Sequence, residues 1–231
     1  MKSMTWIKPL ISFLFPAYCI SCHERLPKEH HHICEKCFEQ LPKYEGLETF
    51  YHPHDRIEGF VPFSEIRSDL IFTKHSVTRE LIHLMKYQGF PELGYKLARD
   101  FALRHKGLGH FADISAIVPI PVAPRRLKTR GYNQSSFIAK GFGEIYRCPI
   151  IEDVLWRTSG NTQTKRDKEA RWKAMEGVFE GQEGALAGKR ILLIDDVLTS
   201  GATVIHASKA LYDICGAESV SIYTLALDVY L

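Results

Sequence analysis

Two adjacent aspartates, Asp195 and Asp196, stand between an apolar run and a turn rich in hydroxyl groups, in the stretch "RILLIDDVLTSGATV" (residues 190–204). Like charges in contact repel, so the pair is not expected to stabilise the fold by itself. The apolar run predicts a buried strand, and the small polar residues after it predict the start of a helix. We therefore interpret the two carboxylates as a binding feature at the end of a strand.

The turn that follows the aspartates has the properties of an anion site. Gly201 lets the backbone approach a ligand closely, and a helix that opens at Thr203 would offer free N–H groups and a favourable dipole to a phosphate. The neighbouring carboxylates would accept hydrogen bonds from the vicinal hydroxyls of a sugar. The residues thus predict a sugar phosphate as ligand. The alternatives are a metal ion on the paired aspartates, although the chain has no Walker-type G-x4-G-K-[ST] sequence, or an acidic pair without function.

Near the N-terminus, four cysteines form two C-x2-C pairs that are separated by eleven residues: Cys19, Cys22, Cys34 and Cys37. Each pair brings two sulfurs to one side of a tight turn, and four thiolates suit a tetrahedral Zn²⁺ ion. Disulfides are the alternative, and one of the histidines between the pairs (His23, His30, His31 or His32) could replace a thiolate. With four protein ligands no position stays open for chemistry, so we expect a structural zinc module.

Length and charge place the chain among ordinary globular proteins. Its 231 residues can bury one core beside a small module, and a net charge of +3 does not by itself indicate nucleic-acid binding. The longest apolar stretch near the start, "PLISFLF" (residues 9–15), is too short for a membrane span and lacks a signal-peptide cleavage pattern. We expect this segment to pack against the body of a cytoplasmic protein.

A change in composition after "LPKYEG" divides the chain into the cysteine module, residues 1–46, and a main domain, residues 47–231. Two β-prone runs, residues 57–66 and 70–76, are separated by Arg67, Ser68 and Asp69 and predict a hairpin-like pair. Apolar periodicity then predicts a helix from Thr78 and a second helix through Leu97 and Leu103.

From residue 114 the chain alternates between apolar runs and helical patterns. Strands are predicted at "ISAIVPI", "RILLID" and "SVSIYTLAL", and helices at "NQSSFIAKGFGEIY" and "TVIHASKALYDIC". This alternation is typical of an α/β fold with a parallel sheet that is covered by helices on both faces. In such sheets ligands bind beyond the carboxyl ends of the strands, where both aspartates are expected.

A basic segment, "PVAPRRLKTRGYNQ" (residues 121–134), follows the first of these strands and would attract an anionic ligand; its cations are Arg125, Arg126, Lys128 and Arg130. Gly131 gives the backbone freedom to aim Arg130. A solvated basic surface is the alternative. Arginines beside aromatic residues such as Tyr132 and Trp172 also suit single-stranded nucleic acid, through phosphate contacts and base stacking.

The stretch "ILLIDDVLTSGAT" resembles the signature for 5-phosphoribosyl-1-pyrophosphate (PRPP) in type I phosphoribosyltransferases. The cysteine pairs are followed along the chain by "LIHLMKYQG", "IVPIPVAPRRLKTRGYNQ" and "TQTKRDKEARW". With these motifs and the stretch above, the chain as a whole resembles the ComF family, phosphoribosyltransferase-like proteins associated with competence for DNA uptake. These pieces cover nearly the whole chain in order. It departs from the family pattern at Ser200, where Thr is usual, and at Ala174, where Asn is usual.

The resemblance implies a type I phosphoribosyltransferase-like domain that binds PRPP with Mg²⁺. Asp195 and Asp196 would hold the ribose hydroxyls and, with Arg130, carry any catalysis. The 5′-phosphate would lie against Thr199, Ser200, Gly201, Ala202 and Thr203. The pyrophosphate would face Arg125, Arg126, Lys128 and Arg130. Residues 161–173 resemble the mobile catalytic loop of this fold, although a plain exposed loop is the alternative.

Two functions follow from the resemblance. The first is a PRPP-binding protein that handles single-stranded DNA during natural transformation, together with proteins of the competence machinery. The alternative is an active phosphoribosyltransferase that uses an unidentified nucleobase or amine as acceptor. No residue in the sequence identifies that acceptor.

Overall fold

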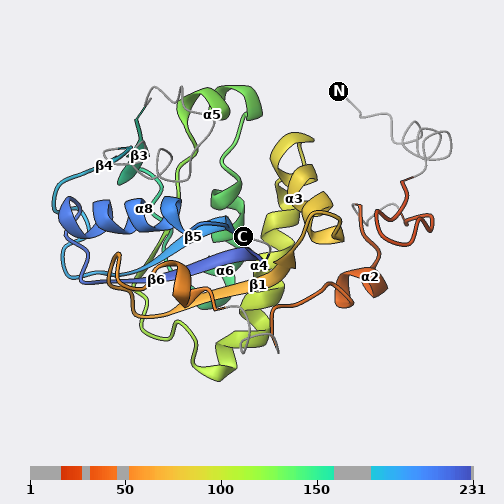
Figure 1. The fold of residues 1–231 in the computed structure, drawn as a ribbon, viewed down its shortest axis with the longest axis horizontal. Coiled ribbons are helices and arrows are strands. Elements are labelled where there is room, and N and C mark those ends of the chain that lie inside the picture. The colour runs from red at the N-terminus through yellow and green to blue at the C-terminus, as the bar shows by residue number, and fades with distance from the viewer. Residues whose placement is uncertain (1–16, 28–31, 46–51, 159–177, 230–231) are drawn as a thin grey trace, which may run out of the picture.

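A four-stranded parallel sheet organises the main domain of the computed structural model, which describes residues 17–27, 32–45, 52–158 and 178–229 (Figure 1). The sheet has the order β1-β6-β5-β2. Its strands are β1 (Ile66–Phe72), β6 (Ser219–Asp228), β5 (Arg190–Leu198) and β2 (Ala116–Pro119). All three neighbouring pairs are parallel, so the carboxyl ends of the strands meet at one edge.

The sheet separates two apolar cores. Leu192 and Ile194 contribute to one core, and Ile191 and Leu193 contribute to the other. Side chains alternate between the two faces of a strand, so this division means that both faces are buried. The continuous apolar run of β5 in the sequence has this physical cause.

Helices cover both faces of the sheet. Apolar residues of α3 (Val77–Tyr87), α4 (Glu92–His105) and α6 (Gln134–Tyr146) share the first core, and those of α8 (Ala202–Asp213) share the second. The predicted fold class, a parallel sheet flanked by helices, is therefore confirmed. The expected helices and the strands after residue 114 are present with small shifts in their ends.

The predicted hairpin over residues 57–76 is wrong. Residues 66–72 form the single strand β1, which runs straight through the polar residues that had indicated a turn. Ser68 Oγ lies 2.6 Å from Thr224 Oγ1 in the neighbouring strand, and the buried carboxylate of Asp69 accepts from Arg104 Nη2 at 2.7 Å. These polar side chains are tolerated within the strand because their partners come from distant parts of the chain.

The structure adds elements that the sequence pattern did not predict. Residues of the basic segment form the short helix α5 (Pro124–Arg130), with Pro124 in its first turn, where a missing N–H costs nothing. Strands β3 (Leu155–Arg157) and β4 (Phe179–Gly181) pair antiparallel beside the main sheet. Among the residues that the structure describes, the remaining short helices are α2 (Glu35–Glu39), η1 (His54–Arg56) and η2 (Lys106–Leu108).

The cysteine module shares the first core instead of packing separately. Leu26, Ile33 and Phe38 belong to the same apolar cluster as residues of α3 and α4. The last residues of the module run beside β1, where the N–H of Ile71 donates to Pro42 O at 2.9 Å. The boundary at residue 46 lies outside the described residues and stays a prediction. Among the helices of the described ranges, none has the length and apolar character needed to cross a bilayer.

Candidate functional site

The two aspartates lie at the carboxyl edge of the sheet, inside β5, which continues to Leu198. Asp196 is buried, and both of its oxygens are engaged: Oδ1 lies 2.7 Å from Lys86 Nζ, and Oδ2 accepts from Gln134 Nε2 at 2.6 Å. The ammonium group offsets one of the two adjacent negative charges. A residue of α3 therefore reduces the repulsion that makes the pair unusual in the sequence.

Asp195 has a different environment. Its Oδ1 accepts from the backbone N–H of Asp196 at 2.8 Å and from Ser135 Oγ at 3.4 Å. Within the described ranges, its Oδ2 accepts no hydrogen bond. Burial and the charge of Asp196 raise the pKa of Asp195 to about 7, although the Asp196 N–H and Lys86 act in the opposite direction. Asp195 thus presents an unengaged carboxyl oxygen to the site.

The turn after β5 leads directly into α8. Gly201 caps the helix with φ 79°, and a Cβ atom there would lie 2.6 Å from Arg56 O, so only glycine fits this position without strain. Arg56 also donates through Nη1 to Thr199 O and through Nη2 to Asp228 O at 2.7 Å. This clamp from η1 fixes the turn, and the first N–H groups of α8 have no acceptor within the helix. They can bind an anion.

The basic segment lies on the helix α5. Arg126 and Arg130, one helical turn apart, both line the site. Arg130 Nη1 donates to Gln134 Oε1, and its guanidinium carbon lies 5.1 Å from the centre of the Tyr87 ring. Arg125 lines an adjoining cavity instead, and Lys128 lines neither.

A cavity of about 230 Å³ brings the predicted residues together. Those that line it are Asp195, Asp196, Thr199, Thr203, Arg126 and Arg130. Ser200, Gly201 and Ala202 form the adjacent turn without lining the cavity. Carboxylates, a helix N-terminus and guanidinium groups thus surround one small volume, which can hold a ligand that carries both hydroxyl and anionic groups.

Among the lining residues that sequence reasoning missed, three carry a charge or an amide: Lys86, Gln134 and Arg157. Lys86 follows one helical turn after the buried Ile82, and a charged residue on an apolar face was an available signal. Asn133 Nδ2 donates to Ile120 O at 3.0 Å and caps α6, so the cap places Gln134 beside the end of β2. Arg157 ends a strand that the pattern did not predict.

Arg157 lies between charges of both signs. Burial and the neighbouring positive charge of Arg126 lower the pKa of Arg157, while Asp195 raises it. Two guanidinium groups that repel each other in a cavity favour an anion between them.

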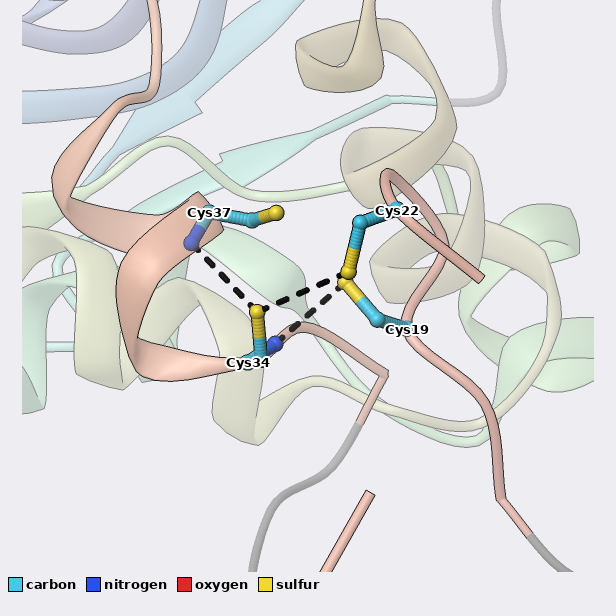
Figure 2. A group of neighbouring side chains, drawn as sticks. All are labelled: Cys19, Cys22, Cys34 and Cys37. Atoms are coloured by element: carbon cyan, nitrogen blue, oxygen red, sulfur yellow. Dashed lines mark hydrogen bonds between the residues drawn. The ribbon is translucent and has the colours of Figure 1, made fainter. Parts of the chain in front are cut away.

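The four cysteines form a separate cluster (Figure 2). Their sulfur atoms all lie within 4.8 Å of one another, and Cys22 Sγ is 3.8 Å from Cys34 Sγ. Backbone N–H groups point at two of the sulfurs: Cys34 N–H donates to Cys19 Sγ, and Cys37 N–H donates to Cys34 Sγ, both at 3.4 Å. The cluster contains neither His23 nor His32.

This cluster is suited to a metal ion. Burial opposes ionisation of the Cys19 thiol, but the backbone N–H groups of Cys22 and Cys34 outweigh it and lower the pKa of Cys19 to about 6. Backbone N–H groups also favour the thiolates of Cys22 and Cys34, but burial and the neighbouring thiols outweigh them and raise the pKa of both, so Cys19 is the thiol of these three that ionises first. Thiolates are the form that binds metal, and four of them at such short distances can complete a tetrahedral shell. Some residues of the sequence-based predictions lie outside the described residues. They are His30, His31, residues 9–15, and the loop 161–173 with Trp172.

Several curated relatives match most of the chain, among them two competence proteins and a DNA utilization protein. Competence protein ComFC of Bacillus subtilis is 28% identical over 210 residues, which cover 90% of this chain and 82% of that protein. Competence protein F of Haemophilus influenzae is 24% identical, and the match covers 92% of this chain and 85% of that protein. DNA utilization protein YhgH of Escherichia coli K12 is 25% identical, and the match covers 87% of this chain and 80% of that protein. These relatives confirm the predicted resemblance to the ComF family.

Solved structures give weaker similarity. Glutamine PRPP amidotransferase of B. subtilis, complexed with ADP and GMP, has a TM-score of 0.38 at 20% identity, with 57% of this chain and 25% of that chain covered. Adenine phosphoribosyltransferase of Leishmania donovani has a TM-score of 0.35 at 15% identity, with 72% of this chain and 86% of that chain covered. Because these TM-scores are low, the fold assignment depends on the strand order and the two cores. No family model matches the chain.

The raised pKa of Asp195 predicts a pH dependence of stability. Between its ordinary value of 3.8 and about 7, the folded protein holds a proton that the unfolded chain releases. This contribution is complete below the lower value and is lost as the pH rises through about 7. Asp195→Asn cannot titrate, so its free energy of unfolding should fall less than that of the wild type between about pH 5 and about pH 8.

Urea unfolding of both proteins across this range measures the difference. Asp69, whose pKa burial also raises to about 7 despite Arg104, is present in both proteins and cancels in the comparison. Parallel pH profiles would mean that Asp195 is ionised throughout.

Proposed function

Because the chain is a relative of the ComF family of competence proteins, we propose that it binds PRPP at the carboxyl edge of its sheet and handles single-stranded DNA during natural transformation. One observation carries the PRPP part: a single cavity of about 230 Å³ is lined by both aspartates, by Thr203 at the start of α8 and by two arginines of α5. A phosphorylated ribose with a second anionic group matches each of these features.

The two aspartates bind the ribose hydroxyls in different ways, because their carboxylates have different hydrogen-bond partners in the protein. Asp195, with one carboxyl oxygen unengaged within the described ranges, accepts a ribose hydroxyl directly. Asp196 already receives hydrogen bonds from Lys86 and Gln134, so a ligand hydroxyl shares an oxygen with one of them. The 5′-phosphate binds at the Thr199–Thr203 turn, which Arg56 holds in place. The ion pair with Lys86 then holds the Asp196 carboxylate in its orientation while the ligand exchanges.

The pyrophosphate group binds on the side of α5. Arg126, Arg130 and Arg157 line the same cavity, and the repulsion between Arg126 and Arg157 is relieved when an anion lies between them. Mg²⁺ that arrives with PRPP would be held mainly by the ligand's phosphate oxygens, and the Asp195 carboxylate is a protein group of the type that Mg²⁺ prefers. Bound there, the ion would neutralise charge that develops on the pyrophosphate.

A transferase reaction would use the same residues. The acceptor nitrogen would bond to C1′ of the ribose as the bond from C1′ to the pyrophosphate oxygen breaks, with the electron pair leaving on pyrophosphate and the acceptor's proton passing to solvent. Asp195 and Asp196 would stabilise the positive charge on the ribose, and Arg130 the leaving group. Release of pyrophosphate from PRPP, measured with nucleobases and amines, separates transfer from binding alone.

The DNA part of the proposal is supported by the exposed cations of α5. Arg125, Arg126 and Lys128 are exposed on this helix, and the first two line a cavity together with the exposed ring of Tyr87. Positive charge beside aromatic rings suits phosphates and stacked bases. The relatives carry names that refer to competence and DNA utilization, so we include competence-machinery proteins among the partners.

We propose Zn²⁺ as the ion of the cysteine cluster, because four thiolates match its preferred ligand set. The same thiolates require a reducing compartment, and we therefore place the protein in the cytoplasm.

The double variant Asp195→Asn/Asp196→Asn tests the PRPP site. Hydrogen bonds to charged groups contribute roughly 1.5–3 kcal/mol each, so loss of both should weaken PRPP binding by about two to four orders of magnitude. Calorimetric titration with PRPP and Mg²⁺ measures the effect, and Asp153→Asn, an exposed carboxylate outside the cavity, is the matched control. A folded double variant that binds PRPP with wild-type affinity would exclude this site.

The zinc proposal predicts one ion per chain, lost in Cys22→Ala and retained in Cys148→Ala, whose thiol lies outside the cluster. Metal binding by such modules is worth about 10–16 kcal/mol in isolated peptides, so the first variant should also lose stability. Elemental analysis of protein purified without chelators is the measurement. Preparations that are folded yet contain no zinc would contradict the assignment.

The DNA proposal predicts that affinity for a short single strand falls steeply with salt. Replacing Arg125, Arg126 and Lys128 with Ala should reduce the slope of log K against log salt by about 0.7 for each phosphate that these cations neutralise in the wild type. Fluorescence anisotropy at several salt concentrations measures the slope. Lys209→Ala, an exposed cation of α8, is the control. An unchanged slope in the triple variant would remove these cations from the DNA surface.

A further inference from the structure

A second cavity, of about 300 Å³, lies beside the first and shares part of its wall. The shared residues are Lys86, Tyr87, Arg126 and Arg130. Arg125 and Tyr132 line the second cavity only, and Asp195 and Asp196 line the first cavity only. The two volumes are therefore neighbours with different chemical character.

The second cavity has an excess of positive charge. Four cationic side chains line it, and no carboxylate of the described ranges does. Lys86 is paired with Asp196 on the side of the first cavity, and Arg130 donates to the neutral amide of Gln134. Neither Arg125 nor Arg126 forms an ion pair with another described residue. Guanidinium groups without an acidic partner favour an anionic ligand, which they can bind in bidentate fashion.

Two aromatic rings give this cavity flat walls. Tyr132 is fixed because its hydroxyl donates to Met85 O at 2.6 Å, at the end of α3. Tyr87 has 66% of its surface exposed, and the Arg130 guanidinium lies against its ring. An exposed ring that is held by a cation offers a face for stacking with a planar group.

We propose that the second cavity binds a small aromatic carboxylate. The cations select the acid group, and the tyrosines select the planar ring. A volume of about 300 Å³ is at the lower end for ligand sites, so it accommodates one ring with its acid group more readily than a whole nucleotide. The assignment depends on the second cavity alone and does not require that the first cavity binds PRPP.

Two matched pairs of probes test the ligand class by calorimetric titration of the full-length protein. Orotate and uracil differ in the carboxylate, and benzoate and cyclohexanecarboxylate differ in the aromatic ring. We expect orotate and benzoate to bind at least about tenfold more tightly than their partners, in accord with one charge-assisted contact. Equal affinity within either pair, or binding of thymidine monophosphate in preference to orotate, would overturn the assignment.

Variants locate the site. Arg125→Gln, which changes the second cavity only, should weaken orotate binding by about 10- to 100-fold. Lys140→Gln, an exposed cation of α6 that lines neither cavity, should have no effect. Asp195→Asn should keep orotate binding even where it loses PRPP, which distinguishes this site from the first. Orotate binding that survives Arg125→Gln, or that Asp195→Asn abolishes, would place the ligand elsewhere.

Discussion

The ion pair between Lys86 and Asp196 is the contact on which the rest of the site depends. It offsets one of two adjacent buried charges, and it links α3 to the central strand β5. From Asp196 the connection continues through Gln134 to Arg130, so a continuous chain of polar contacts joins β5, α3, α6 and α5. A charge that loses its partner in a buried site is costly, so removal of either Lys86 or Asp196 alone would disturb the contacts around the cavity.

The part of the site that could be predicted is the part that is local in sequence. A strand, a turn with Gly201 and a helix follow one another in the chain, and the residue types alone predict both these elements and the kind of ligand they can bind. Lys86, Arg157 and the clamp residue Arg56 come from segments far away in the chain, and only tertiary packing brings them to β5. The wrong hairpin has the same cause. From the sequence alone Asp69 is typical of a turn, and its place inside a strand is explained only by its ion pair with the half-buried Arg104.

The cysteine module and the ligand cavity are physically connected. Ile33 and Phe38 of the module share a core with Leu84 and Met85 of α3, and the next residue along that helix is Lys86. A metal ion that orders the module therefore also supports the helix that carries the cation of the site. The proposed metal ion would thus have a second consequence, because the packing that it would stabilise reaches the ion pair with Asp196.

The two cavities share a wall, and their ligands must therefore influence each other. A ligand hydroxyl that takes an oxygen of Asp196 competes with Lys86, whose ammonium group also borders the second cavity. Released from its carboxylate, that charge would strengthen the attraction for an anion on the other side. Such coupling is reciprocal, since each ligand changes the affinity for the other by the same factor. The sign of the coupling is set by the balance between this release of Lys86 and the competition of two anionic ligands for Arg126 and Arg130, which line both cavities.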